Sequence, residues 1–225
     1  MDIDFKPAFK VEDTDALIII DPQNDFCPPV KGWGGALAVP GGDEIMEMIC
    51  DISTMFKNVV VTQDWHPQNQ ISFASNHEGG EAFGMAKVAY GDQVLWPDHC
   101  VQNTYGSEFH TGILDAVSRA QAIIRKGTNA NVDSYSAFFE NDGVTDTGLS
   151  AYLKAKGIKR VVFVGLAYDF CVGFSALDAI TKCGFESAVI IKDATRAIDL
   201  NGSIESIEEQ FANVGVHVIN SGLLV

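Results

Sequence analysis

The amino-acid sequence predicts an α/β fold, a three-layer α/β/α arrangement in which helices cover both faces of a mainly parallel sheet. Short apolar runs alternate along the chain with segments whose apolar residues recur at helical spacing, which is typical of a parallel sheet. The run 161–164 is entirely apolar and mostly β-branched, as expected of a strand buried on both faces. With 225 residues and 47% apolar content, the chain can form one large domain, which we place at 1–225.

Six strands are expected, and each is a short apolar run bounded by polar or turn residues. In chain order they cover 15–20, 59–62, 122–125, 161–164, 187–192 and 216–220. Two long stretches without sustained periodicity, 67–110 and 127–145, lie between them. Loops of that length inside a compact domain usually carry function.

Helices are expected between the strands. The first opens at 41–43 and has one apolar face, formed by Ile45, Ile49, Ile52 and Phe56. Another begins with Asp146 as its N-cap, runs to Lys156 and stops at Gly157. The remaining helices cover 113–117, the segment that follows Cys171, and 203–212.

Composition and charge exclude several classes of partner. The net charge is −15, from 30 acidic and 15 basic residues, so we expect no nucleic-acid or anionic-membrane partner. No apolar run approaches the roughly 20 residues of a membrane-spanning helix, and residues 1–6 lack a signal-peptide pattern. Five cysteines without a CxxC pair (Cys27, Cys50, Cys100, Cys171 and Cys183) indicate free thiols in a reducing cytoplasm.

Residues with reactive side chains follow the predicted strands. Asp21, Asp64 with His66, Lys126 and Cys171 come after the first, second, third and fourth strands. In parallel sheets, sites lie beyond the carboxyl ends of the strands. We therefore expect an acid, a cation and a thiol around one crevice.

Cys171 is the candidate nucleophile. It lies where the fourth strand passes into a helix, after Gly165 interrupts the apolar run. Free N–H groups and the helix dipole at such a position favour a thiolate, so we expect a lowered pKa for Cys171. The alternative is a small buried thiol with a packing role.

Asp64, Trp65 and His66 form the sharpest local signal for a metal. Side chains two residues apart in an extended chain point to the same side, so the carboxylate and the imidazole can bind one ion. His99 is a candidate third ligand, and His77 and His110 compete with it. Mixed oxygen and nitrogen ligation suits one catalytic Zn²⁺, and Fe²⁺ or Mn²⁺ also fits.

These motifs together resemble those of the nicotinamidases, within the isochorismatase-like cysteine hydrolase superfamily. The similarity extends from residue 15 to about residue 200, and the motifs come in the family's order. They are DPQNDFC (21–27), TQDWHP (62–67), WPDHCVQ (96–102), KG (126–127), DSYSAF (133–138) and GLAYDFCV (165–172).

The resemblance implies a fold and a set of site residues. The sheet would have six strands in the order 3-2-1-4-5-6. The catalytic residues would be Asp21, Lys126 and Cys171, and the metal ligands Asp64, His66 and His99. Ser72 falls where such enzymes often contribute a further metal contact, directly or through water.

The substrate pocket implied by the resemblance is aromatic. Phe26 and Trp96 match residues that line the ring pocket, and Tyr135 matches its rim. A cis peptide is expected at Leu166–Ala167, where the Ala167 N–H would join that of Cys171 in an oxyanion hole. The segment 77–93 matches no motif, which leaves the lid of the pocket unassigned.

The activity implied by the resemblance is hydrolysis of nicotinamide to nicotinate and ammonia through a cysteine thioester. The expected partner is thus a small-molecule amide, and we also expect a homo-oligomer. One alternative is a superfamily hydrolase acting on a carbamoyl or ureido amide, or on isochorismate, which the metal motif disfavours. The other is a catalytically silent binding module, which the intact Asp21, Lys126 and Cys171 disfavour.

Overall fold

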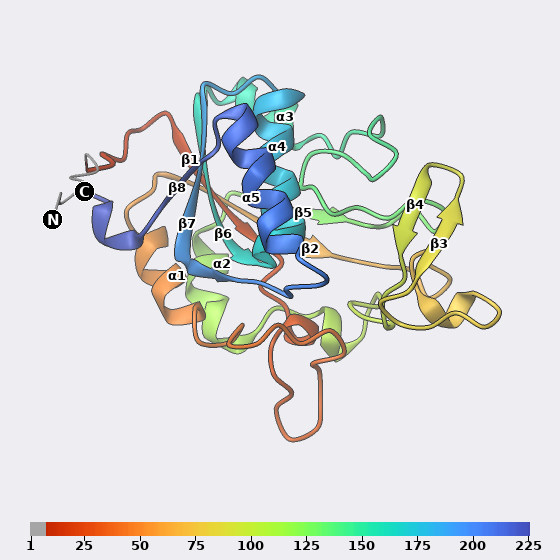
Figure 1. Ribbon diagram of the computed structural model, residues 1–225. Coiled ribbons are helices and arrows are strands. Elements are labelled where there is room, and N and C mark those ends of the chain that lie inside the picture. The colour runs from red at the N-terminus through yellow and green to blue at the C-terminus, as the bar shows by residue number, and fades with distance from the viewer. Residues whose placement is uncertain (1–7) are drawn as a thin grey trace, which may run out of the picture.

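The computed structural model describes residues 8–225 and contains a six-stranded parallel sheet (Figure 1). The strands stand in the order β5-β2-β1-β6-β7-β8. If they are counted along the chain within this sheet, that order is 3-2-1-4-5-6, so the predicted fold class is confirmed. Their bounds are β1 Asp15–Ile20, β2 Asn58–Asp64, β5 Ala122–Lys126, β6 Arg160–Leu166, β7 Ser187–Arg196 and β8 His217–Ile219.

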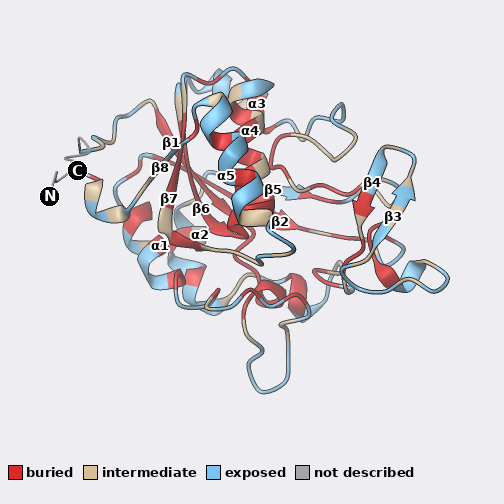
Figure 2. Cartoon of the chain, viewed as in Figure 1, coloured by how far each residue is buried: buried red, intermediate tan, exposed pale blue. Residues whose placement is uncertain are grey.

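Helices cover both faces of the sheet. Successive residues of a strand point to opposite sides, so each buried strand contributes apolar side chains to a core on either face. In β1, Leu17 and Ile19 join the core under α1 (Met46–Ser53) and α2 (Leu114–Arg119). Ile18 and Ile20 join the core on the other face, which is covered by α3 Leu149–Ala155, α4 Gly173–Thr181 and α5 Ser203–Val214. Figure 2 shows the sheet as the most continuously buried part of the chain. One domain over 1–225 stays a prediction.

Short helical turns complete the secondary structure. The 3₁₀ turns cover Asn24–Phe26, Ala74–Asn76, Tyr105–Ser107, Thr111–Ile113 and Ser221–Leu223. A π-helical turn, Tyr168–Val172, precedes α4. Most of these turns lie in the connections between the strands of the main sheet and the helices that cover it.

The main departure from the predicted elements is an antiparallel hairpin within 67–110. Its strands are β3 (Met85–Val88) and β4 (Gly91–Val94), and Figure 1 shows it apart from the main sheet. Sequence reasoning missed it because β4 is mostly polar and Gln93 is its one fully buried residue. A strand of this kind lacks the alternating apolar pattern on which recognition depends.

Smaller differences concern element boundaries. The first helix begins at Met46, because residues 41–45 form turns rather than helix. Asp146 lies two residues before the N-cap of α3, and its carboxylate accepts a hydrogen bond from the Gly148 amide at 2.6 Å. β7 continues to Arg196, beyond the predicted end at 192, because a register shift lets it go on pairing with β6.

Two predictions concern membranes and thiols. Within residues 8–225, no helix combines the length and apolar character required to span a bilayer. The expected absence of a signal peptide concerns residues 1–6, which lie outside the described residues. All five cysteines are free thiols, as predicted.

Replacing Ile18 with Ala should destabilise the fold strongly. Ile18 is fully buried at the centre of β1, and removal of such a side chain leaves a cavity that costs about 2–5 kcal/mol. Urea unfolding followed by circular dichroism measures the loss. The control is Val144→Ala, because Val144 is 80% exposed. Equal stability of the two variants would contradict the packing described above.

Candidate active site and metal centre

The topology brings the predicted site residues together at one edge of the sheet. β1 lies between β2 and β6, and the strand order reverses there, which creates a crevice at the carboxyl ends. Asp21 directly follows β1, whereas Asp64 and Lys126 end β2 and β5 in direct register with each other. Cys171 lies five residues beyond the end of β6. Residues far apart in sequence therefore meet at this crevice.

Lys126 lies at the centre of this group. Its ammonium Nζ is 2.9 Å from Asp21 Oδ2 and 2.9 Å from Asp64 Oδ1. It also donates to the Ser134 carbonyl at 2.8 Å and lies 3.5 Å from Cys171 Sγ. Burial alone would lower the pKa of Lys126, but the two carboxylates and the thiol outweigh it and raise the pKa well above its usual value. The side chain is therefore a permanent cation.

Asp21 is fully buried and is held in one orientation. Its backbone N–H donates to Thr62 Oγ1 at 3.0 Å, and the Thr62 hydroxyl donates to Asp21 Oδ1 at 2.6 Å. Burial raises the pKa of Asp21, with Lys126 opposing and the Asp64 charge adding to the rise. A carboxylate with a raised pKa is a stronger base.

Cys171 lies on the π-helical turn Tyr168–Val172, and its pKa contradicts the expectation from the helix dipole. Cys171 is only 7% exposed, and burial raises the pKa of its thiol well above the usual value, despite the opposing charge of Lys126. Asp21 and Asp64 raise the pKa further. The expected lowering was wrong, because Cys171 is buried beside two carboxylates and lies within the turn, not at its first residue.

Asp64, His66 and His99 form the predicted metal-binding group, and all three are buried. One ligand atom from each lies within 4.8 Å of the others. Asp64 Oδ2 is 2.9 Å from His66 Nε2 and 3.5 Å from His99 Nε2. Burial disfavours a charged His66, but the Asp64 carboxylate outweighs this and raises the pKa of His66 to about 9. The site thus attracts positive charge.

The surroundings of both imidazoles suit metal ligation. His66 Nδ1 is 3.0 Å from the Gly127 carbonyl, and His99 Nδ1 is 2.8 Å from the Pro97 carbonyl. A carbonyl at Nδ1 fixes the proton there and leaves Nε2 as the ligand atom. Ser72 Oγ is buried without a hydrogen-bond partner among the described residues, and its role as a further metal contact stays a prediction. The residues present therefore fit a divalent ion.

The competing histidines lie elsewhere. His77 Nε2 bonds to the Ile71 carbonyl at 2.6 Å, and His110 Nδ1 accepts from the Gly112 amide at 3.2 Å. Neither belongs to the buried group of metal-ligating side chains. Among the three candidates, the structure brings only His99 to Asp64 and His66.

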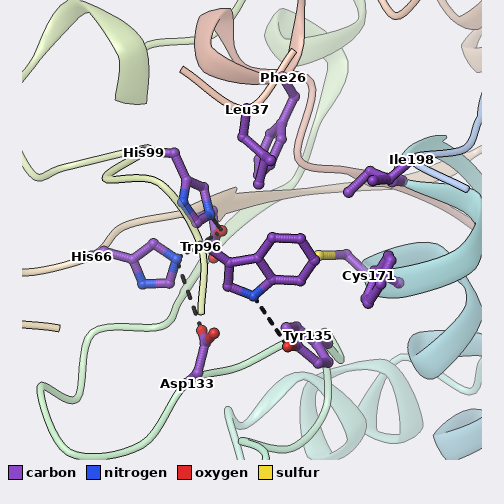
Figure 3. A pocket seen from close by; sticks show the side chains of 12 residues that line it. Phe26, Leu37, His66, Trp96, His99, Asp133, Tyr135, Cys171 and Ile198 are labelled. Atoms are coloured by element: carbon purple, nitrogen blue, oxygen red, sulfur yellow. Dashed lines mark hydrogen bonds and ion pairs between the residues drawn. The ribbon is translucent and has the colours of Figure 1, made fainter. Parts of the chain in front are cut away.

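A small pocket separates the metal-binding group from Cys171 (Figure 3). Phe26, Trp96 and Tyr135 line it, as the resemblance implied. Trp96 Nε1 donates to Tyr135 Oη at 3.1 Å, and Phe170 packs edge-on against Trp96 at 5.0 Å between ring centroids. Aromatic walls of this kind suit a flat aromatic ligand.

The expected oxyanion-hole residues also reach the pocket. The Leu166–Ala167 peptide bond is cis, as the resemblance implied. Ala167 and Cys171 both line the pocket. Both residues are thus placed where a bound carbonyl group could meet them.

Sequence reasoning missed several pocket residues, namely Leu37, Asp133, Phe170 and Ile198. Asp133 Oδ1 lies 3.9 Å from His66 Nε2, which places a second carboxylate, besides that of Asp64, near the metal-binding group. Asp133 and Phe170 lie within the motifs DSYSAF and GLAYDFCV, so the sequence contained a signal for these two residues. Leu37 and Ile198 lie in loops outside the motifs. No local pattern predicts their contacts with the pocket, because such contacts depend on tertiary packing.

The parallel sheet and the group of Asp21, Lys126 and Cys171 at its carboxyl edge indicate that this protein is a hydrolase. The model of the isochorismatase domain family matches residues 15–221, and the chain belongs to that family. A nicotinamidase from Acinetobacter baylyi is 50% identical over 206 residues, 92% of each chain.

Two solved structures are also similar. PnC1 from L. infantum in complex with nicotinate is 40% identical with a TM-score of 0.82, covering 97% of this chain and 98% of that one. The pyrazinamidase of Pyrococcus horikoshii in complex with zinc is 36% identical with a TM-score of 0.71, covering 92% and 99%.

Gly127→Ala should reduce the metal content of the protein. Gly127 has φ +64°, and an added Cβ would lie 2.6 Å from His66 Nδ1, so the imidazole must move. The matched control is Gly157→Ala, because Gly157 has φ +73° but no described atom within 4 Å of an added Cβ. Both variants carry a backbone strain of about 1 kcal/mol. Elemental analysis after purification without added ions should show loss in the first variant only, and equal metal content in both would contradict the assignment.

Proposed function

We propose that this protein hydrolyses nicotinamide to nicotinate and ammonia through a thioester on Cys171. The single observation that carries the proposal is the buried contact of Lys126 with Asp21, Asp64 and Cys171 beside an aromatic pocket. The similarity to the A. baylyi nicotinamidase supports the same substrate. An ammonia-release assay with nicotinamide tests the proposal directly.

Acylation begins with proton transfer from Cys171 to Asp21. The thiolate sulfur then attacks the carboxamide carbon, a C–S bond forms, and the carbonyl electron pair moves to oxygen. The N–H groups of Ala167 and Cys171 stabilise this oxyanion. When the C–N bond breaks, Asp21 returns the proton to nitrogen and ammonia leaves.

Deacylation uses the same base. Asp21 accepts a proton from a water molecule that attacks the thioester carbon, and the C–S bond breaks. The sulfur takes the proton back from Asp21, and the acid is released and ionises to nicotinate. The raised pKa of Asp21 suits this cycle because it makes the carboxylate a stronger base. Burial raises the pKa of Cys171, and the charge of Lys126 opposes that rise by favouring the thiolate.

The metal ligands in this proposal are Asp64, His66 and His99, with Ser72 as a further contact. The ion is divalent, and Zn²⁺ fits best, with Fe²⁺ or Mn²⁺ also compatible. When bound, it supplies a Lewis-acid position for a pyridine nitrogen or a water molecule. The zinc complex of the P. horikoshii pyrazinamidase supports this choice.

The cellular location and the oligomeric state of the enzyme are also proposals. Five free thiols support a cytoplasmic location, where thiols stay reduced. A homo-oligomer stays a prediction, which sedimentation velocity checks. A carbamoyl or ureido substrate is the second candidate, and it would be favoured if nicotinamide is not hydrolysed.

Cys171→Ala should abolish turnover and leave the fold intact, because the change from thiol to methyl is small. Steady-state ammonia release measures the loss, and circular dichroism checks the fold. Cys183→Ala is the matched control, since Cys183 is also buried but lies outside the pocket, and it should keep most activity. Near-normal turnover in Cys171→Ala would refute the nucleophile.

Nicotinamide should be hydrolysed far better than benzamide, which fits the same aromatic slot but lacks the ring nitrogen. Removal of the ion with a chelator, or His66→Ala, should reduce this advantage, and added Zn²⁺ should restore it only to the chelated wild-type protein. Competition between the two amides in one assay gives the ratio of kcat/KM values. Equal rates for the two amides would show that the metal-binding group does not select the ring.

A further inference from the structure

The hairpin β3–β4, to which neither the sequence motifs nor the proposed mechanism assigns a role, contributes one fully buried side chain. Gln93 on β4 is 1% exposed, whereas its neighbour Asp92 is exposed. A buried amide without partners would be costly, so its contacts reveal why it is turned inward.

Gln93 is hydrogen-bonded at both ends of its amide. Its Oε1 accepts from Tyr90 Oη at 3.0 Å and from Asn141 Nδ2 at 3.0 Å. Its Nε2 donates to Tyr135 Oη and to the Val94 carbonyl, both at 2.8 Å, and lies 3.4 Å from Asp133 Oδ2. Because two donors contact Oε1, that atom is the amide oxygen. The amide nitrogen Nε2 therefore faces the pocket residues Tyr135 and Asp133.

The contact with Gln93 determines which hydrogen bonds the Tyr135 hydroxyl can make. Its Oη accepts from Gln93 Nε2 and also from Trp96 Nε1 at 3.1 Å, which occupies both lone pairs of the hydroxyl. Among the residues that the structure describes, none accepts the Tyr135 hydroxyl hydrogen. Since Tyr135 lines the pocket, that hydrogen remains available to a ligand.

We propose that Gln93 is a positioning residue that, together with Trp96, holds the Tyr135 hydroxyl as a hydrogen-bond donor toward the bound substrate. The ligand class is a heteroaromatic carboxamide whose carbonyl oxygen accepts from Tyr135 in the bound substrate, before the thiolate attacks. This inference rests on the proposed amidase function. The hairpin thereby contributes to substrate recognition although none of its own side chains reacts.

Asp133 explains why an amide, and not a carboxylate, occupies position 93. Its Oδ1 accepts from the Ser134 amide at 2.7 Å, and its Oδ2 faces Gln93 Nε2. A carboxylate at position 93 would keep the bonds from Tyr90 and Asn141. It would repel Asp133, however, and accept the Tyr135 hydrogen, so the donor would turn away from the substrate.

The test is a double-mutant cycle on nicotinamide hydrolysis. Gln93→Met removes all the hydrogen bonds of the amide at similar size, Gln93→Glu reverses the bond to Tyr135, and Tyr135→Phe removes the donor. Each single variant should raise KM about tenfold or more and change kcat by less than about threefold. In the Tyr135→Phe background, Gln93→Met should raise KM by less than about twofold, because both changes remove one interaction.

The controls separate this role from a structural one. Asp92→Asn alters the exposed neighbour on β4 and should leave both constants unchanged. Thermal unfolding identifies any variant that fails to fold, and Tyr135→Phe, whose ring keeps its packing, decides the matter if Gln93 variants do not fold. An unchanged KM in Tyr135→Phe, or fully additive effects in the double variant, would overturn the inference. Absence of turnover in the wild-type protein would instead refute the amidase function itself.

Discussion

The buried ammonium of Lys126 is the interaction on which the rest of the site depends. An unpaired cation in the interior costs several kcal/mol, and here the carboxylates of Asp21 and Asp64 offset that cost. Asp21 directly follows β1 and Asp64 ends β2, so the ion pairs with Lys126 hold the ends of β1, β2 and β5 together. The same lysine also contacts the thiol of Cys171, which joins the reactive side and the metal-binding side of the pocket.

The two carboxylates on this lysine have opposite acid–base properties. Burial raises the pKa of Asp21, whereas at Asp64 the effect of burial is outweighed by His66 and Lys126, which lower the pKa well below its usual value. Asp21 is thus suited to accept a proton, and Asp64 stays charged and suits a cation. Neighbouring carboxyl groups whose pKa values are pushed apart commonly divide such roles.

The pocket is built from two kinds of segment, the ends of the strands of the main sheet and the segments outside that sheet. The strand ends carry the reactive groups, and the segments outside the sheet supply Phe26, Trp96, Tyr135 and the hairpin with Gln93. Loops on a rigid scaffold are where binding specificity usually resides. Here the loops are tied to one another by part-buried side-chain hydrogen bonds, which orient the aromatic walls.

The sequence by itself determined the six strands, their helical partners and the residues at the strand ends, because apolar periodicity and short motifs are local properties. It also indicated the order of the sheet and the ligand group Asp64, His66 and His99, through a resemblance to a family. Only the tertiary structure decided the high pKa of Cys171, the sharing of Lys126 between two carboxylates, and the hairpin that buries Gln93. Desolvation and hydrogen bonding across 40 or more positions depend on packing in three dimensions, which no local pattern records.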